Sequence, residues 1–139
     1  RLADKLNQAL FRVYIGDRVE IGAGLYINHG QVAIDGLVRI GEECTVSPFV
    51  TIGLSNSVRN WGSLGQGPWI GDGVHIGTGA RILGPVRVGH GVRVGANAVV
   101  ITDVPDRCTA VGVPARVLAP AEERYPPPDV GVLPAPASR

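Results

Sequence analysis

Aliphatic residues return at every sixth position through most of this chain of 139 residues. Between positions 70 and 104, each six-residue unit begins with Ile, or later Val, and carries a second apolar residue, Val or Ala, four positions later. This spacing matches neither the helical period of about 3.6 residues nor the simple alternation of a lone hairpin. A short fixed repeat is typical of a solenoid, and a six-residue repeat is typical of a parallel β-helix. The pattern therefore predicts a mainly β fold in which each unit is one short strand followed by a corner.

The repeat extends over residues 15–118 and is interrupted twice. It begins at Ile15, and one residue is inserted in the unit that follows Ile27. The period is lost at residues 53–69 and resumes in register at Ile70, so this segment is predicted to be a loop extruded from one coil. With three strands to a turn, the repeats account for about four coils.

Both ends of the chain differ from the repeat. Residues 1–14 are predicted to form a helical cap, because one face of a helix over 2–13 collects the apolar residues Leu2, Leu6, Leu10 and Val13. Such a cap would cover the open end of the first coil. Residues 119–139 are rich in Pro and Ala and are predicted to be an extended, poorly ordered tail. The chain contains no methionine, so we expect further residues before Arg1.

Charge and cysteine usage exclude some classes of partner and make the cytoplasm the default compartment. The net charge is +1, which gives no basic footprint for nucleic acid or a membrane surface. No apolar run approaches the roughly 18 residues of a membrane span. The two cysteines, Cys44 and Cys108, have no metal-type spacing, and Cys44 falls on an inward position of its unit. We therefore expect no metal, and a buried thiol at Cys44.

Four features together resemble the hexapeptide-repeat acyltransferases, in the branch of the serine O-acetyltransferases and the acetyltransferases of polysaccharide clusters. They are the six-residue units, the segment Ile27-Asn28-His29-Gly30, the interrupting loop, and the ending Gly112-Val113-Pro114-Ala115-Arg116-Val117. The resemblance covers about residues 13–118. It implies a left-handed parallel β-helix, a homotrimer, acetyl-CoA as the donor, and active sites between neighbouring subunits.

His29 is the candidate general base. It lies beside the inserted residue, and an extra residue next to a strand commonly re-aims a side chain near a site. In the family, the histidine at this point of the pattern is the base, and the resemblance implies the same role for His29. A neutral imidazole takes the proton of an acceptor hydroxyl as the oxygen attacks the thioester carbonyl. We expect direct transfer without an acyl-enzyme, because neither cysteine matches a nucleophile beside a base.

Other ionisable residues have less specific roles. His75 and His90 occupy outward positions of regular units and are predicted to be solvated. The carboxylates nearest to His29 in sequence, as candidates to orient its ring, are Asp35 and Glu42.

Small residues along one face would let the pantetheine arm of acetyl-CoA lie against the backbone. The candidates are Gly79, Ala80, Ala96 and Ala98. Arg116 matches a family position near the nucleotide, where a cation meets phosphate. The acceptor, a small molecule with a hydroxyl or an amine, is expected to contact Asn28, Trp61 and Gln66, and Trp69 is a candidate for the same pocket or for a subunit contact.

Three departures from the serine-specific pattern affect the acceptor. Asn28 stands where that pattern has Asp, and Tyr14 stands about where it has the Asp that partners the histidine. The segment Gln66-Gly67-Pro68 stands where it has a basic residue, a histidine and a proline. L-Serine is therefore in doubt, and the acceptor stays open between a sugar or glycan hydroxyl, an amino-acid hydroxyl and a specialised metabolite.

Three alternatives remain. The same chemistry on an amine would make an N-acetyltransferase of an amino sugar or metabolite. A solenoid without catalysis would serve as a trimeric scaffold. A zinc enzyme of the γ-carbonic-anhydrase kind needs three converging histidines, and the paired histidine spacing of that branch is missing here.

Overall fold

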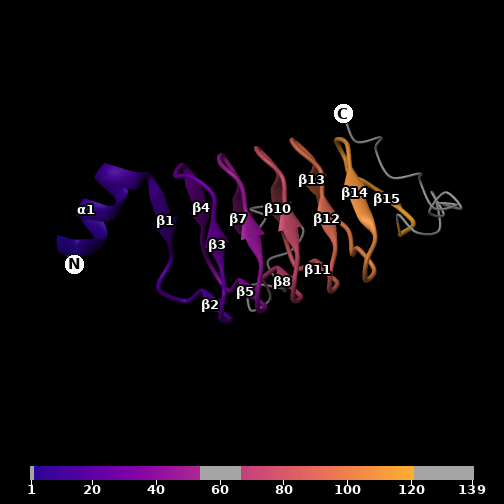
Figure 1. The fold of residues 1–139 in the computed structure, drawn as a ribbon, viewed down its shortest axis with the longest axis horizontal. Coiled ribbons are helices and arrows are strands. Elements are labelled where there is room, and N and C mark those ends of the chain that lie inside the picture. Colours follow the sequence, from indigo (N-terminus) through magenta and orange to yellow (C-terminus); the bar gives the residue numbers. More distant parts are fainter. Residues whose placement is uncertain (1, 54–66, 121–139) are drawn as a thin grey trace, which may run out of the picture.

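The protein is a β-solenoid in which a single chain winds through three parallel sheets (Figure 1). This computed structural model describes residues 2–53 and 67–120. We call these sheets A, B and C. The chain passes through them in this constant order, so each turn contributes one strand to each sheet. Four complete turns of three strands are followed by a fifth that β13 and β14 begin. The predicted mainly β architecture of about four coils is confirmed, and β14 pairs with β15 in the antiparallel sense.

The strands are short because each one fills a single side of the coil. Sheet A contains β1 (Val13–Ile15), β4 (Val32–Ile34), β7 (Thr51–Gly53), β10 (Arg81–Leu83) and β13 (Val99–Val100). Sheet B contains β2 (Glu20–Ile21), β5 (Arg39–Ile40), β8 (Trp69–Ile70) and β11 (Arg87–Val88). Sheet C contains β3 (Tyr26–Ile27), β6 (Thr45–Val46), β9 (His75–Ile76), β12 (Arg93–Val94), β14 (Thr109–Val111) and β15 (Arg116–Leu118).

The six-residue repeat builds the core as predicted. The first positions stack in register from turn to turn, as in the series Ile34, Ile52, Ile82 and Val100 on sheet A. These four side chains are at most 1% exposed, and the second apolar positions lie inside beside them. One coil has no interior of its own, so the stacked turns supply both the apolar contacts and the backbone hydrogen bonds.

The N-terminal helix forms, but its apolar face does not cover the first turn. Helix α1 (Leu2–Phe11) projects away from β1 at the end of the solenoid (Figure 1). Its residues Leu2, Leu6 and Leu10 remain 51–75% exposed. Only Arg12, with a φ of 51°, separates the helix from β1, and this short link directs the helix outward. The first coil therefore stays partly open, and Ile15 is 40% exposed.

Three corners join the sheets, and each is a column of turns along the solenoid axis. The C–A corner is the column formed by residues 28–31, 47–50, 77–80, 95–98 and 112–115. The A–B and B–C corners run parallel to it. Within residues 2–53 and 67–120, no helix is long and apolar enough to cross a membrane.

Candidate functional site

His29 lies on the C–A corner of the first turn, between β3 and β4. The predicted extra residue is present in this turn, and Gln31 takes a left-handed φ of 67° to complete it. The His29 side chain is exposed, and among the described residues no hydrogen bond or ion pair reaches it. The ring is therefore free to meet a molecule bound at this corner.

Asn28 precedes His29 and is also exposed, while its backbone N–H donates to the carbonyl of Val46, at 2.9 Å. The carboxylates considered as partners of His29 lie elsewhere. Asp35 follows sheet A and lies at the A–B corner, and Glu42 follows sheet B and lies at the B–C corner. Neither shares the C–A corner with His29, because the chain passes along a new side of the coil with each strand. One strand separates His29 from Asp35, and two separate it from Glu42.

The residues predicted to hold acetyl-CoA lie higher on the same corner. Gly79 is in the third turn with a φ of 71°, and Arg116 pairs with Val111 where β14 reaches the corner in the fifth turn. The methyl groups of Ala80 and Ala98 are completely buried in the core. Their side chains are therefore unavailable to a surface ligand, because the repeat that marked them as small also turns them inward.

Two backbone groups on this corner are open to a ligand: that of Ala96, already a candidate for its small side chain, and that of Thr78, which was not predicted from the sequence. The N–H groups of Thr78 and Ala96 occupy equivalent places in successive turns, and both residues are exposed. Neighbouring corner N–H groups are paired, as in Gly79 donating to the Pro48 carbonyl at 2.9 Å and Asn97 donating to the Thr78 carbonyl at 2.8 Å. Among the described residues, nothing accepts from Thr78 or Ala96. The sequence signal that could have found Thr78 is its middle position in a Gly-x-Gly corner, which Ala96 repeats one turn later between Gly95 and Asn97.

Phe49 is the second feature that sequence reasoning missed. It lies on the C–A corner one turn above His29, with a φ of 63° and a side chain that is 54% exposed. In the next two turns this left-handed position is held by Gly79 and Asn97, which tolerate it. A bulky residue there costs about 1–2 kcal/mol. Strain combined with exposure beside His29 makes Phe49 a candidate site residue.

The other candidates are distributed as follows. Trp61 and Gln66 lie outside the described residues. Trp69 is described and faces out from sheet B, away from the C–A corner. A side chain at Gly67 would overlap the carbonyl group of Leu37. The backbones at positions 67 and 37 are thus so close that the histidine of the serine-specific pattern would fit at position 67 only after a local shift.

The remaining histidines are exposed as predicted. His75 faces out from sheet C. His90 accepts a hydrogen bond from the backbone N–H of Asp72 at Nδ1, at 3.0 Å, and lies 3.2 Å from the Asp72 carboxylate. Within the described part of the chain, no three His, Cys, Asp or Glu side chains gather as metal ligands would.

Cys44 is buried at the B–C corner, away from His29. Burial raises the pKa of its thiol, and Sγ donates to the carbonyl of Gly71 at 3.1 Å. A raised pKa keeps the thiol protonated at neutral pH, and a protonated thiol is a poor nucleophile.

We therefore expect Cys44 in the folded protein to react with iodoacetamide at least about tenfold more slowly than in the unfolded chain. Mass spectrometry of timed, quenched samples measures this rate. Labelling of Cys44 at the same rate in both states would contradict its assignment as an inert core thiol.

Comparison with known proteins places this geometry in a family. Residues 67–102 match the family model described as bacterial transferase hexapeptide (six repeats). A serine acetyltransferase of Helicobacter pylori strain J99 is 36% identical over 119 residues, which cover 85% of this chain and 67% of that protein. The chain belongs to the hexapeptide-repeat acetyltransferases of the serine acetyltransferase type.

Other serine acetyltransferases extend the match. The protein of Synechococcus elongatus is 34% identical over 96% of this chain, but the matched region is only 54% of that protein. This serine acetyltransferase-type chain thus spans about half the length of several curated relatives. A solved serine acetyltransferase in complex with CoA superposes with a TM-score of 0.72 at 28% identity, over 84% of this chain and 46% of that one.

Proposed function

We propose that this protein is an acetyl-CoA-dependent O-acetyltransferase in which His29 is the general base. The observation that carries the proposal is the alignment of features on one corner. His29, Phe49 and Gly79 come from separate turns, and the winding of the coil brings them to the C–A column, while Arg116 lies beside its last turn, paired with Val111. The family and the solved relative bound to CoA support the same donor.

The C–A corner suits a long, thin ligand. Strands in a sheet are about 4.8 Å apart, so the four steps from the first turn to the fifth span roughly 19 Å. The N–H groups of Thr78 and Ala96, which have no partner in the described part of the chain, lie along this path and would donate to the amide carbonyls of the pantetheine arm. Arg116 at the upper end would meet the phosphates of the nucleotide, and the thioester would then lie at the lower end beside His29.

The chemistry follows from that orientation. The acceptor oxygen attacks the thioester carbonyl while the imidazole of His29 takes the hydroxyl proton. The tetrahedral intermediate collapses, the carbon–sulfur bond breaks, and the imidazolium returns the proton to the leaving sulfur of CoA. No cysteine enters this sequence, because Cys44 is buried at another corner.

The acceptor is a small molecule with a nucleophilic hydroxyl, and Asn28 is the described residue placed beside His29 to contact it. Trp61 and Gln66 are kept as proposed contacts from outside the described residues. The absence of an acidic side chain at position 28 favours acceptors other than L-serine. We propose a homotrimer as the working assembly, because a neighbouring subunit would close the exposed C–A corner.

The test is release of the CoA thiol with a panel of acceptors: L-serine, homoserine, simple sugars, amino sugars and glycan oligomers. We expect turnover with at least one hydroxyl acceptor, and mass spectrometry of the product to show an ester. An amide product on an amino sugar would support N-acetylation instead. Binding of acetyl-CoA without turnover on any acceptor, or no binding at all, would contradict the proposal and favour the scaffold alternative.

Phe49 supplies a prediction on the donor side. Asparagine tolerates a left-handed φ, so Phe49→Asn is expected to keep or raise the free energy of unfolding by up to about 1 kcal/mol. The same change removes an apolar surface beside the proposed thioester position, so KM for acetyl-CoA is expected to rise several-fold. Thermal unfolding and steady-state kinetics measure the two effects.

Glu43→Asn is the matched control, because Glu43 has a φ of 52° at the B–C corner of the same turn. It should show the stability effect without the change in KM. A similar KM for both variants and the parent would remove Phe49 from the proposed site.

A further inference from the structure

A second candidate site lies over sheet B, on another side of the coil from His29. The outward residues of its four strands stand in register as Glu20, Arg39, Trp69 and Arg87. The corresponding row on sheet A is Tyr14, Ala33, Thr51, Arg81 and Val99. Sheet B thus combines opposite charges with an aromatic ring, whereas sheet A presents mostly small or apolar side chains.

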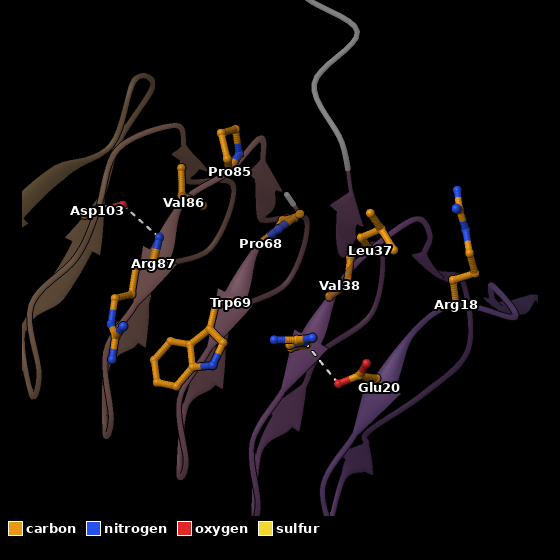
Figure 2. A pocket seen from close by; sticks show the side chains of 12 residues that line it. Arg18, Glu20, Leu37, Val38, Pro68, Trp69, Pro85, Val86, Arg87 and Asp103 are labelled. Atoms are coloured by element: carbon orange, nitrogen blue, oxygen red, sulfur yellow. Dashed lines mark hydrogen bonds and ion pairs between the residues drawn. The ribbon is translucent and has the colours of Figure 1, made fainter. Parts of the chain in front are cut away.

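A groove of about 390 Å³ follows this row, and we call it the sheet B groove. Figure 2 shows its layout, with Leu37, Pro68 and Pro85 along the A–B corner and Trp69 and Arg87 below them. The volume is in the range of small-molecule pockets. A small ligand is therefore the occupant that the groove fits.

The charges that line the groove leave it positive. Three arginines, Arg18, Arg39 and Arg87, face two carboxylates. Glu20 is engaged by Nε of Arg39 at 3.0 Å, and Oδ1 of Asp103 accepts from the backbone N–H of Arg87 at 2.7 Å (Figure 2). Among the described residues, no carboxylate pairs with the guanidinium of Arg18 or Arg87. These two groups can therefore receive an anion.

Arg87 and Trp69 are held in place before any ligand binds. The guanidinium carbon of Arg87 lies 4.2 Å from the centroid of the Trp69 ring. The imidazole of His90 meets the same indole edge-to-face, with centroids 5.5 Å apart and planes at 81°. Ordering two large side chains in advance lowers the entropy lost on binding. The planar guanidinium still presents N–H groups that match a carboxylate or phosphate.

We infer that the sheet B groove binds a small molecule that carries a carboxylate or phosphate on a ring. The anionic group meets Arg87, with Arg18 further along the groove, and the ring packs against Trp69. Within one chain the groove runs along the A–B corner, and the proposed acetyl-CoA path runs along the C–A corner, with sheet A between them. The inference stands on its own and does not require the proposed acetyltransferase reaction.

The test is calorimetry on the full chain with three anionic probes, glucose 6-phosphate, glucuronate and benzoate, and with glucose as the uncharged probe. We expect saturable binding of at least one anionic probe and at least about tenfold weaker binding of glucose, because charge-assisted hydrogen bonds are stronger than neutral ones. The affinity for glucose 6-phosphate, compared with the affinities for glucuronate and benzoate, shows whether the groove prefers a phosphate or a carboxylate. Arg87→Gln and Trp69→Leu should each lower the affinity for the probe that binds by about tenfold or more.

Arg93→Gln is the matched control, because Arg93 holds the same outward position of a strand in the same turn, on sheet C. It should bind the probe as the parent does, and circular dichroism should show all three variants folded. No saturable binding of any anionic probe, or equal binding by Arg87→Gln, would overturn the inference. Competition between acetyl-CoA and the probe would also overturn it, because the groove would then belong to the donor site.

Discussion

Replacing His29 with glutamine is expected to lower kcat about 10²–10⁴-fold on whichever acceptor the protein uses, since that is the usual contribution of a positioned general base. Glutamine keeps a polar side chain of similar size but cannot take a proton from the acceptor. KM for acetyl-CoA should change less than about threefold, because the proposed donor contacts at Thr78, Ala96 and Arg116 are untouched. Stopped or continuous thiol-release kinetics give both constants.

His75→Gln is the control, since His75 is also exposed but faces out from sheet C. It should retain the parent kcat. A His29→Gln protein with kcat within a few-fold of the parent, on an acceptor with measurable turnover, would end the assignment of His29 as the base. Equal loss in the two variants would point to a shared effect of the substitution on folding.

Gly41→Ala is expected to lower the free energy of unfolding by about 2–4 kcal/mol, from overpacking and from the loss of a surface hydrogen bond between neighbouring turns. A Cβ at Gly41 would lie 2.7 Å from the carbonyl carbon of Gly71 and 2.8 Å from the backbone N of Asp72, and closer still to the Asp72 carboxylate. That carboxylate accepts from the backbone N–H of Glu42 at 2.8 Å. The neighbouring turn cannot move away, because the N–H of Gly41 is bonded to the Ile70 carbonyl at 2.8 Å.

Gly73→Ala is the matched control at the same B–C corner, one turn later. Gly73 has a φ of 62°, but a Cβ there would meet nothing within 4 Å. Its expected cost is therefore only the left-handed penalty of about 1 kcal/mol. Urea unfolding of the two variants separates close packing from backbone conformation, and a Gly41→Ala protein as stable as Gly73→Ala would contradict the close stacking of the turns.

The core could be predicted from the sequence because one rule governs every turn. A six-residue period with three strands to a turn determines which side chains point inward, and Ile52, Ile82 and Val100 follow it. The same period places Trp69 and Arg87, which are 18 residues apart, one above the other on sheet B. The sequence could therefore have indicated the sheet B row, but not the side-chain conformations that bring Arg87 over the indole.

Other features depend on geometry that the repeat does not encode. The outward direction of α1 follows from the conformation of the single linking residue Arg12, and its apolar pattern suggested a cap instead. Asp35 and Glu42 are near His29 in sequence, but the coil carries them to other corners. The exposed backbone at Thr78 and the left-handed φ of Phe49 are backbone properties, and residue types alone do not specify them. The left-handed winding stays a prediction from the resemblance.

The most direct measurement is a crystal structure of the protein with CoA bound. The account predicts that the pantetheine arm runs along residues 77–80 and 95–98 of the C–A corner, accepts from the N–H groups of Thr78 and Ala96, and brings its sulfur beside His29 of the same or a neighbouring subunit. CoA bound in the sheet B groove, or with its sulfur at another corner, would contradict the proposed site and with it the role of His29.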